Sequence, residues 1–209
     1  MTPPPVRRRR RGPIAVLVAV LAVAALVTWS VVLAGASGPA GPSSCPPAAA
    51  EPVPGAPLEP GALDAVPPAP PAQVGVRVLN AGDQRGQAGL VLAQLEDLGF
   101  VEAAPPGNDP FYPDGGMECV GQLRFGAAGE AAASTLSLAL PCVELVRDER
   151  GDAAVDLSVG TGFSGVSPSR PARDALETLG APSPADDGEG DAPAPVDPAL
   201  LAAARDVDC

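Results

Sequence analysis

A change of hydrophobic period within residues 74–100 constrains the fold more than any other feature of the sequence. In residues 74–78 valine alternates with other residues, which is the pattern of a half-buried strand. From Gln87 to Leu98 the apolar residues instead recur at helical spacing along one face. Gly99 then suits the left-handed position that ends many helices. The stretch therefore predicts a strand–loop–helix unit with a defined start and end.

The residues that follow predict a second unit of strands and a helix. Alternation and turn residues indicate further strands and an alanine-rich helix: strands at 100–104, 122–125, 143–146 and 155–159, and a helix at 127–140. The order is βαββαβ followed by one more strand. This order predicts an α+β fold, a small βαββαβ-type sheet with helices packed on one face.

Residues 164–209 are expected to form a C-terminal extension with short helices and an acidic linker. A short helix is predicted at 171–179, and the acidic, Pro/Gly-rich residues 181–196 are expected to be disordered. Asp197 followed by Pro198 gives the N-cap and first position of a last helix.

The N-terminal part predicts a single-pass membrane anchor. Residues 1–12 form a basic tail with five arginines, and the apolar residues 13–35 that follow are long enough, as a helix, to cross a bilayer. The arginines place the N-terminus inside and the domain outside the cytoplasmic membrane. A small-x-small sequence at 34–36 leaves signal-peptide cleavage as the alternative, but ordinary signal cores have only about 7–15 apolar residues. Residues 36–73 are predicted to be a Pro-rich linker.

Charge argues against nucleic acid as a partner. All 13 basic residues are arginine, and all 25 acidic residues follow residue 50. The chain beyond the apolar run therefore carries 8 − 25 = −17 charges. Such a domain repels nucleic acid and anionic lipid.

The residues that most catalytic and metal sites need are missing from the sequence. The chain has no histidine and no lysine, which excludes Ser-His, Cys-His and Ser-Lys nucleophile pairs. Its four cysteines include no C-x-x-C pair, so we expect no zinc site. The acidic residues of 148–156 lack the order of a calcium loop and favour a solvated turn. Glycines 82, 86 and 89 do not have the spacing of a phosphate loop. We therefore expect a non-enzymatic protein without cofactor or metal.

Several short motifs resemble the LytR C-terminal domain, a family of cell-envelope proteins. They are Val76-Arg77-Val78-Leu79-Asn80, Gly86-Gln87-Ala88, Leu98-Gly99-Phe100, Gln122-Leu123-Arg124-Phe125-Gly126 and Asp156-Leu157-Ser158-Val159-Gly160. The resemblance covers residues 74–163. The whole chain is similar to envelope-integrity members of that family, with a basic N-terminus, one membrane helix and a Pro-rich linker. The resemblance implies a role in cell envelope integrity, with envelope proteins or cell-wall polymer as partners. It also implies that the phosphotransferase domain of larger members is missing.

The loop between the first strand and helix is the best candidate for ligand binding. A helix N-terminus at Gly86 can hold an anionic group, and Arg85 lies beside it. Asn80 begins the loop, and Arg124 on a later strand is a further candidate. A binding or scaffold module is the first hypothesis. A small-ligand or wall-polymer sensor is the second, and an accessory enzyme of wall assembly the third.

All four cysteines follow the apolar run, in the compartment where disulfides persist. Cys119 and Cys142 precede the two strands of one predicted parallel crossover, so both are expected at the same end of the sheet. The predicted pairs are therefore Cys119–Cys142 and Cys45–Cys209. The alternative is an intermolecular bond through Cys45, which would give a dimer.

Overall fold

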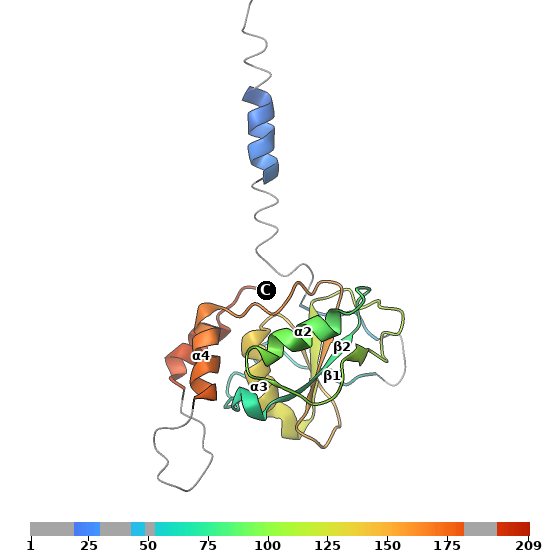
Figure 1. Cartoon of the computed structure of the whole chain (residues 1–209), viewed down its shortest axis with the longest axis vertical. Coiled ribbons are helices and arrows are strands. Elements are labelled where there is room, and N and C mark those ends of the chain that lie inside the picture. The colour runs from blue at the N-terminus through green and yellow to red at the C-terminus, as the bar shows by residue number, and fades with distance from the viewer. Residues whose placement is uncertain (1–18, 30–42, 49–52, 182–195) are drawn as a thin grey trace, which may run out of the picture. The chain divides into compact units, whose positions relative to one another are not determined.

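The computed structural model describes residues 19–29, 43–48, 53–181 and 196–209 (Figure 1). The chain divides into two units, Met1–Gly38 and Pro39–Cys209. In the first unit, residues 19–29 are helical and exposed. None of the helices in the described ranges is long and apolar enough to span a bilayer. Most of the predicted anchor lies outside these ranges, as do the predicted acidic linker and parts of the Pro-rich segment.

The second unit is built on a seven-stranded mixed sheet in the order β1-β6-β5-β7-β2-β3, with β4 also paired to β2. The strands are β1 (Ala56–Pro57), β2 (Gly75–Asn80), β3 (Val101–Glu102), β4 (Gly107–Asn108), β5 (Gly121–Phe125), β6 (Glu144–Arg147) and β7 (Val155–Val159). The central strands β2 and β7 are parallel, whereas β5 and β7 are antiparallel. The predicted α+β class is confirmed, and β5 and β6 are parallel as the predicted crossover requires.

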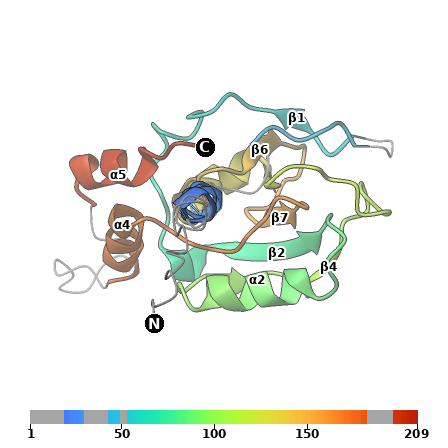
Figure 2. The same ribbon diagram turned by 90° about the horizontal axis from the view of Figure 1, so that it is seen from above.

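The helices are α2 (Gln87–Glu96), α3 (Glu130–Ala139), α4 (Arg170–Gly180) and α5 (Pro198–Arg205), with short 3-10 turns η1 (Pro71–Gln73) and η2 (Ala127–Gly129). The helices α2 and α3 pack on the sheet, whereas α4 contacts α3 and η1, and α5 packs on α4 beside the end of the sheet (Figure 2). The inward side chains of these helices and alternate residues of the strands form one continuous apolar core. Asp197 caps α5 as predicted, because its carboxylate accepts a hydrogen bond from the Ala199 amide at 2.8 Å.

Part of the predicted linker belongs to the folded unit. Leu63 is buried in the main core, and β1 pairs with β6 as the edge strand of the sheet. The Ser134 and Thr135 hydroxyls on α3 donate to the carbonyls of Val66 and Ala69. A Pro-rich segment has no period of its own, so its attachment depends on long-range partners that the sequence pattern does not show.

The predicted disulfide pairing is wrong. The bonds are Cys45–Cys119 and Cys142–Cys209. Cys119 belongs to a small cluster that also contains Met117 and Tyr112, whereas Cys142 packs against the main core beneath the helices. The two cysteines therefore precede neighbouring parallel strands but enter different packing layers, and a shared end of the sheet does not bring them into contact.

Candidate functional site

The predicted binding loop from Asn80 to Gly86 is held by its own hydrogen bonds. The Asn80 side-chain amide donates to the Gln84 carbonyl at 2.8 Å, and its oxygen accepts from the Gly82 amide at 3.2 Å. Asn80 thus shapes the loop, and both of its polar groups already have partners. Arg85 is exposed, and Gly86 caps α2 with a positive φ of 78°.

Arg124, the fourth predicted binding residue, lies apart from that loop. Its side chain is 1% exposed, and its Nη2 lies 2.8 Å from Oδ2 of Asp109. Nε and Nη2 also donate to the Gln122 side-chain oxygen at 3.0 and 2.7 Å. The structure therefore does not bring Arg124 together with Arg85. Ligand binding by Asn80, Arg85, Gly86 and Arg124 remains a prediction.

The Arg124–Asp109 pair forms the centre of a buried polar layer on the sheet face opposite the helices. Asp109 also accepts hydrogen bonds from the Phe111 amide, at 2.8 Å, and from the Ser158 hydroxyl. The Arg124 guanidinium lies 5.0 Å from the Phe111 ring centre and 5.9 Å from that of Tyr112. Its Nη1 is buried and has no hydrogen-bond partner among the described residues. The pair orders the loop that carries the two aromatic rings.

A second charged group extends along the same face. Asp156 on β7 pairs with Arg77 on β2, and it lies 2.8 Å from Arg150, which also pairs with Asp148. Burial alone would raise the pKa of Asp156, but hydrogen bonds from Arg150 and Arg77 outweigh this and hold the pKa below its ordinary value. Asp156 is therefore a structural anion in a row of ion pairs.

We expect Asp156→Asn to reduce the pH dependence of stability in acid. Because the pKa of Asp156 is lowered by folding, its stabilising contribution is complete above the unfolded pKa of about 3.9 and is lost as the pH falls through the folded value. Urea unfolding between neutral pH and pH 3 measures the slope. Asp152→Asn in the adjacent exposed turn is the control and should leave it unchanged. Equal slopes for wild type and Asp156→Asn would contradict the prediction.

The N-terminal strap, residues 43–48, crosses the loop that covers the polar layer. Cys45 is joined to Cys119, and the Tyr112 hydroxyl donates to the Pro46 carbonyl at 2.7 Å. The Cys45 amide donates to Glu144 at 3.3 Å, and Glu144 in turn accepts from Gln122 at 2.7 Å. The strap therefore connects to the network around Arg124 through both covalent and polar contacts.

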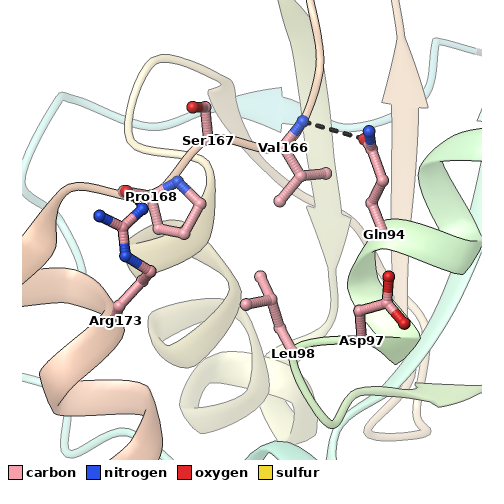
Figure 3. A pocket seen from close by; sticks show the side chains of 7 residues that line it. All are labelled: Gln94, Asp97, Leu98, Val166, Ser167, Pro168 and Arg173. Atoms are coloured by element: carbon pink, nitrogen blue, oxygen red, sulfur yellow. Dashed lines mark hydrogen bonds between the residues drawn. The ribbon is translucent and has the colours of Figure 1, made fainter.

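A solvent-open groove of about 260 Å³ lies between α2 and the start of α4, and we call it the α2–α4 groove (Figure 3). Its lining consists of seven side chains: Gln94, Asp97, Leu98, Val166, Ser167, Pro168 and Arg173. Gln94 fixes one wall to the other, because its side-chain oxygen accepts from the Val166 amide at 3.1 Å. Asp97 and Arg173 stand on opposite sides of the groove.

Sequence reasoning missed this groove. The helical period of α2 places Gln94 and Asp97 on its polar face, and this pattern is typical of ordinary solvent-exposed surface. The other wall, residues 166–168, lies in an irregular connection more than 60 positions away, as the separation of 72 between Gln94 and Val166 shows. Only the tertiary fold places these segments side by side.

The sheet, its helix-covered face and its envelope-protein motifs define a LytR C-terminal domain. Residues 73–163 match the family described as LytR cell envelope-related transcriptional attenuator, and the chain belongs to this family. The chain is similar to the cell envelope integrity protein Cei of Mycobacterium tuberculosis, with 39% identity over 166 residues, which cover 77% of this chain and 76% of that protein.

A solved structure shows the same domain. It is the soluble domain of a conserved hypothetical secreted protein from Mycobacterium marinum, which is 37% identical to this chain. The match covers 74% of this chain and 98% of that one, with a TM-score of 0.63. These relationships confirm the resemblance expected from the sequence, and they associate the protein with the cell envelope.

Proposed function

We propose that this protein is a membrane-anchored, non-enzymatic module that supports cell envelope integrity by binding envelope proteins or wall polymer outside the cytoplasmic membrane. The similarity to Cei carries this proposal, because it extends over 77% of the chain at 39% identity and so includes much more than the common domain. Two disulfides support an extracytoplasmic domain, since such bonds persist in oxidising compartments. The basic tail and apolar run support the anchor.

The chemistry of the polar layer supports a binding role over a catalytic one. Its strongest charges, Arg124, Asp109 and Asp156, are paired with each other or with neighbouring residues. A sequence without histidine or lysine also lacks the commonest general base and the amine nucleophile. These charges hold loops in place rather than activate a substrate.

The Cys45–Cys119 bond gives the proposed anchor a short reach. Cys45 is fixed to the domain, so only the nine residues 36–44 separate it from the predicted membrane span. At about 3.1 Å per residue in extended polyproline, they allow roughly 28 Å. The limit depends on Cys45 being bonded to the domain, and a bond to Cys209 would impose the same limit. The proposed partners therefore lie near the membrane surface.

A sensor function through the loop at Arg85 is the second candidate. Arg85 is exposed directly before Gly86, where the N-terminus of α2 begins, so an anionic group has access to both. The Arg85→Ala variant separates this candidate from a purely structural loop, because Arg85 makes no ion pair in the described part of the chain.

Genetic complementation tests the proposed function. We expect deletion of the gene to sensitise cells to detergent and the full chain to restore resistance. A version secreted without residues 13–35, matched in abundance by immunoblot, should restore much less because it is no longer held near the membrane. Full rescue by the secreted version would overturn the anchored role. Loss of rescue by Arg85→Ala at unchanged thermal stability would favour the sensor.

A further inference from the structure

We propose that the α2–α4 groove is a binding site for a short zwitterionic peptide. Arg173 would bind the carboxylate of the ligand and Asp97 its ammonium group (Figure 3). Peptide binding in this groove is separate from the proposed envelope role and does not depend on the membrane anchor.

Arg173 and Asp97 both lack a counter-ion among the described residues. Within the described residues, five arginines of the domain pair with acidic side chains, but Arg173 and Asp97 form no ion pair. Arg173 donates one hydrogen bond, from Nη1 to the Pro168 carbonyl at 2.8 Å, which holds its guanidinium beside the groove. Its Nε and Nη2 have no hydrogen-bond partner among the described residues. Arg85 and Arg170 also form no ion pair within the described residues, but Arg173 differs from them because its hydrogen bond to Pro168 holds it at the groove.

Each of the two charges has the unfavourable sign for its position on its helix. Arg173 lies near the N-terminus of α4, where the helix dipole is positive, and Asp97 is the C-cap of α2, where the dipole is negative. Both placements work against helix stability. Departures from local rules of this kind are expected where residues serve function. The positive N-terminus of α4 adds to the charge of Arg173, and the negative C-terminus of α2 adds to the charge of Asp97. Each helix end therefore strengthens the electrostatic potential on its own side of the groove.

The size and lining of the groove suit a small peptide. Its volume of about 260 Å³ lies below the 300–1,000 Å³ typical of sites for drug-sized ligands, which favours a dipeptide-sized ligand over a folded partner. Leu98 and Val166 offer apolar surface between the two charges. The amide nitrogen of Gln94 has no hydrogen-bond partner in the described chain, so it is available to a peptide carbonyl.

The site is largely formed before any ligand binds. The Gln94–Val166 hydrogen bond and the Arg173–Pro168 hydrogen bond join the groove walls to the 166–168 segment. The Pro168 side chain is buried, and Ser169 caps α4 by accepting from the Ala172 amide at 3.3 Å. A preformed site loses less conformational entropy on binding.

Calorimetric titration of the full chain in detergent micelles tests the proposal. The probe is the dipeptide Ala-Ala, compared with N-acetyl-Ala-Ala, which lacks the ammonium, and Ala-Ala amide, which lacks the carboxylate. We expect saturable binding of Ala-Ala at millimolar concentration, and binding about tenfold weaker or more for each blocked form. Free alanine and phosphoethanolamine distinguish other zwitterions, and equal or tighter binding of either would overturn the peptide assignment.

Charge-removing variants locate the site. Arg173→Gln should weaken Ala-Ala binding while making it insensitive to the loss of the carboxylate, and Asp97→Asn should do the same for the ammonium. Arg170→Gln and Glu96→Gln remove neighbouring exposed charges on the same helices that do not line the groove, and they should bind normally. No binding of Ala-Ala, or equal weakening by the control variants, would overturn the proposal. Thermal unfolding of each variant confirms that the fold is intact.

Discussion

Asp109→Ala is expected to lower the free energy of unfolding by about 3–5 kcal/mol, because it leaves the Arg124 charge buried without a counter-ion. Both residues are 1% exposed, so water cannot replace the lost carboxylate. The substitution also removes the acceptor for the Phe111 amide and the Ser158 hydroxyl. Urea unfolding at neutral pH measures the change.

Two further variants separate the ion pair from general disturbance of the layer. Arg77→Met breaks a pair whose arginine side chain is 42% exposed, and Asp156 keeps Arg150 as a partner, so we expect a loss of at most about 1 kcal/mol. Asp109→Asn combined with Arg124→Met removes both charges but keeps a side-chain acceptor at position 109. This double variant should be more stable than Asp109→Ala. Equal losses for Asp109→Ala and Arg77→Met would contradict the assigned role of the buried pair.

The elements with strong periods were predictable from the sequence alone. The strand β2 and helix α2 appear where the period changes from two to helical spacing, and α4 and α5 lie close to their predicted bounds. Their signals are local, because burial of one face fixes the spacing of apolar residues. The shorter strand β3 is the exception within this unit, since only Val101 and Glu102 pair with β2.

The parts that the sequence did not show depend on long-range contacts. β1 is a two-residue strand in a Pro-rich segment, and it exists only because β6 offers a free edge. Arg124 was singled out as a ligand residue, but its partner Asp109 lies in a loop 15 positions earlier, between two prolines and the aromatic residues. The sequence pattern around an arginine does not show whether its side chain pairs with a carboxylate of the same chain or binds a ligand.

Removal of the Cys142–Cys209 bond is expected to cost about 4 kcal/mol. The bond closes a separation of 67 residues, and the chain-entropy model gives this magnitude for loops of that length. Such a loss is a large share of a net stability of about 5–15 kcal/mol. The variant Cys142→Ala with Cys209→Ala, compared with the oxidised wild type by urea unfolding, measures it.

The same variant should also loosen α5 in the native state. Only Ala204 of this helix is fully buried, and Arg205 supplies its main polar contacts, donating to the Asp64 carbonyl at 2.6 Å. Hydrogen exchange should therefore accelerate in α5 well before it does in β5 or β7. Unchanged exchange in α5 would show that Arg205 and apolar packing suffice to hold the helix.

The matched variant Cys45→Ala with Cys119→Ala removes a bond that closes a similar separation of 74 residues, and it should cost about the same on the chain-entropy model. Its local effect differs, because it releases the strap at residues 43–48 from the loop above Arg124. Faster exchange should then appear at the Tyr112 and Met117 amides rather than in α5. Peptide mapping without reduction checks the pairing on which both variants depend, and a Cys119–Cys142 peptide would contradict it.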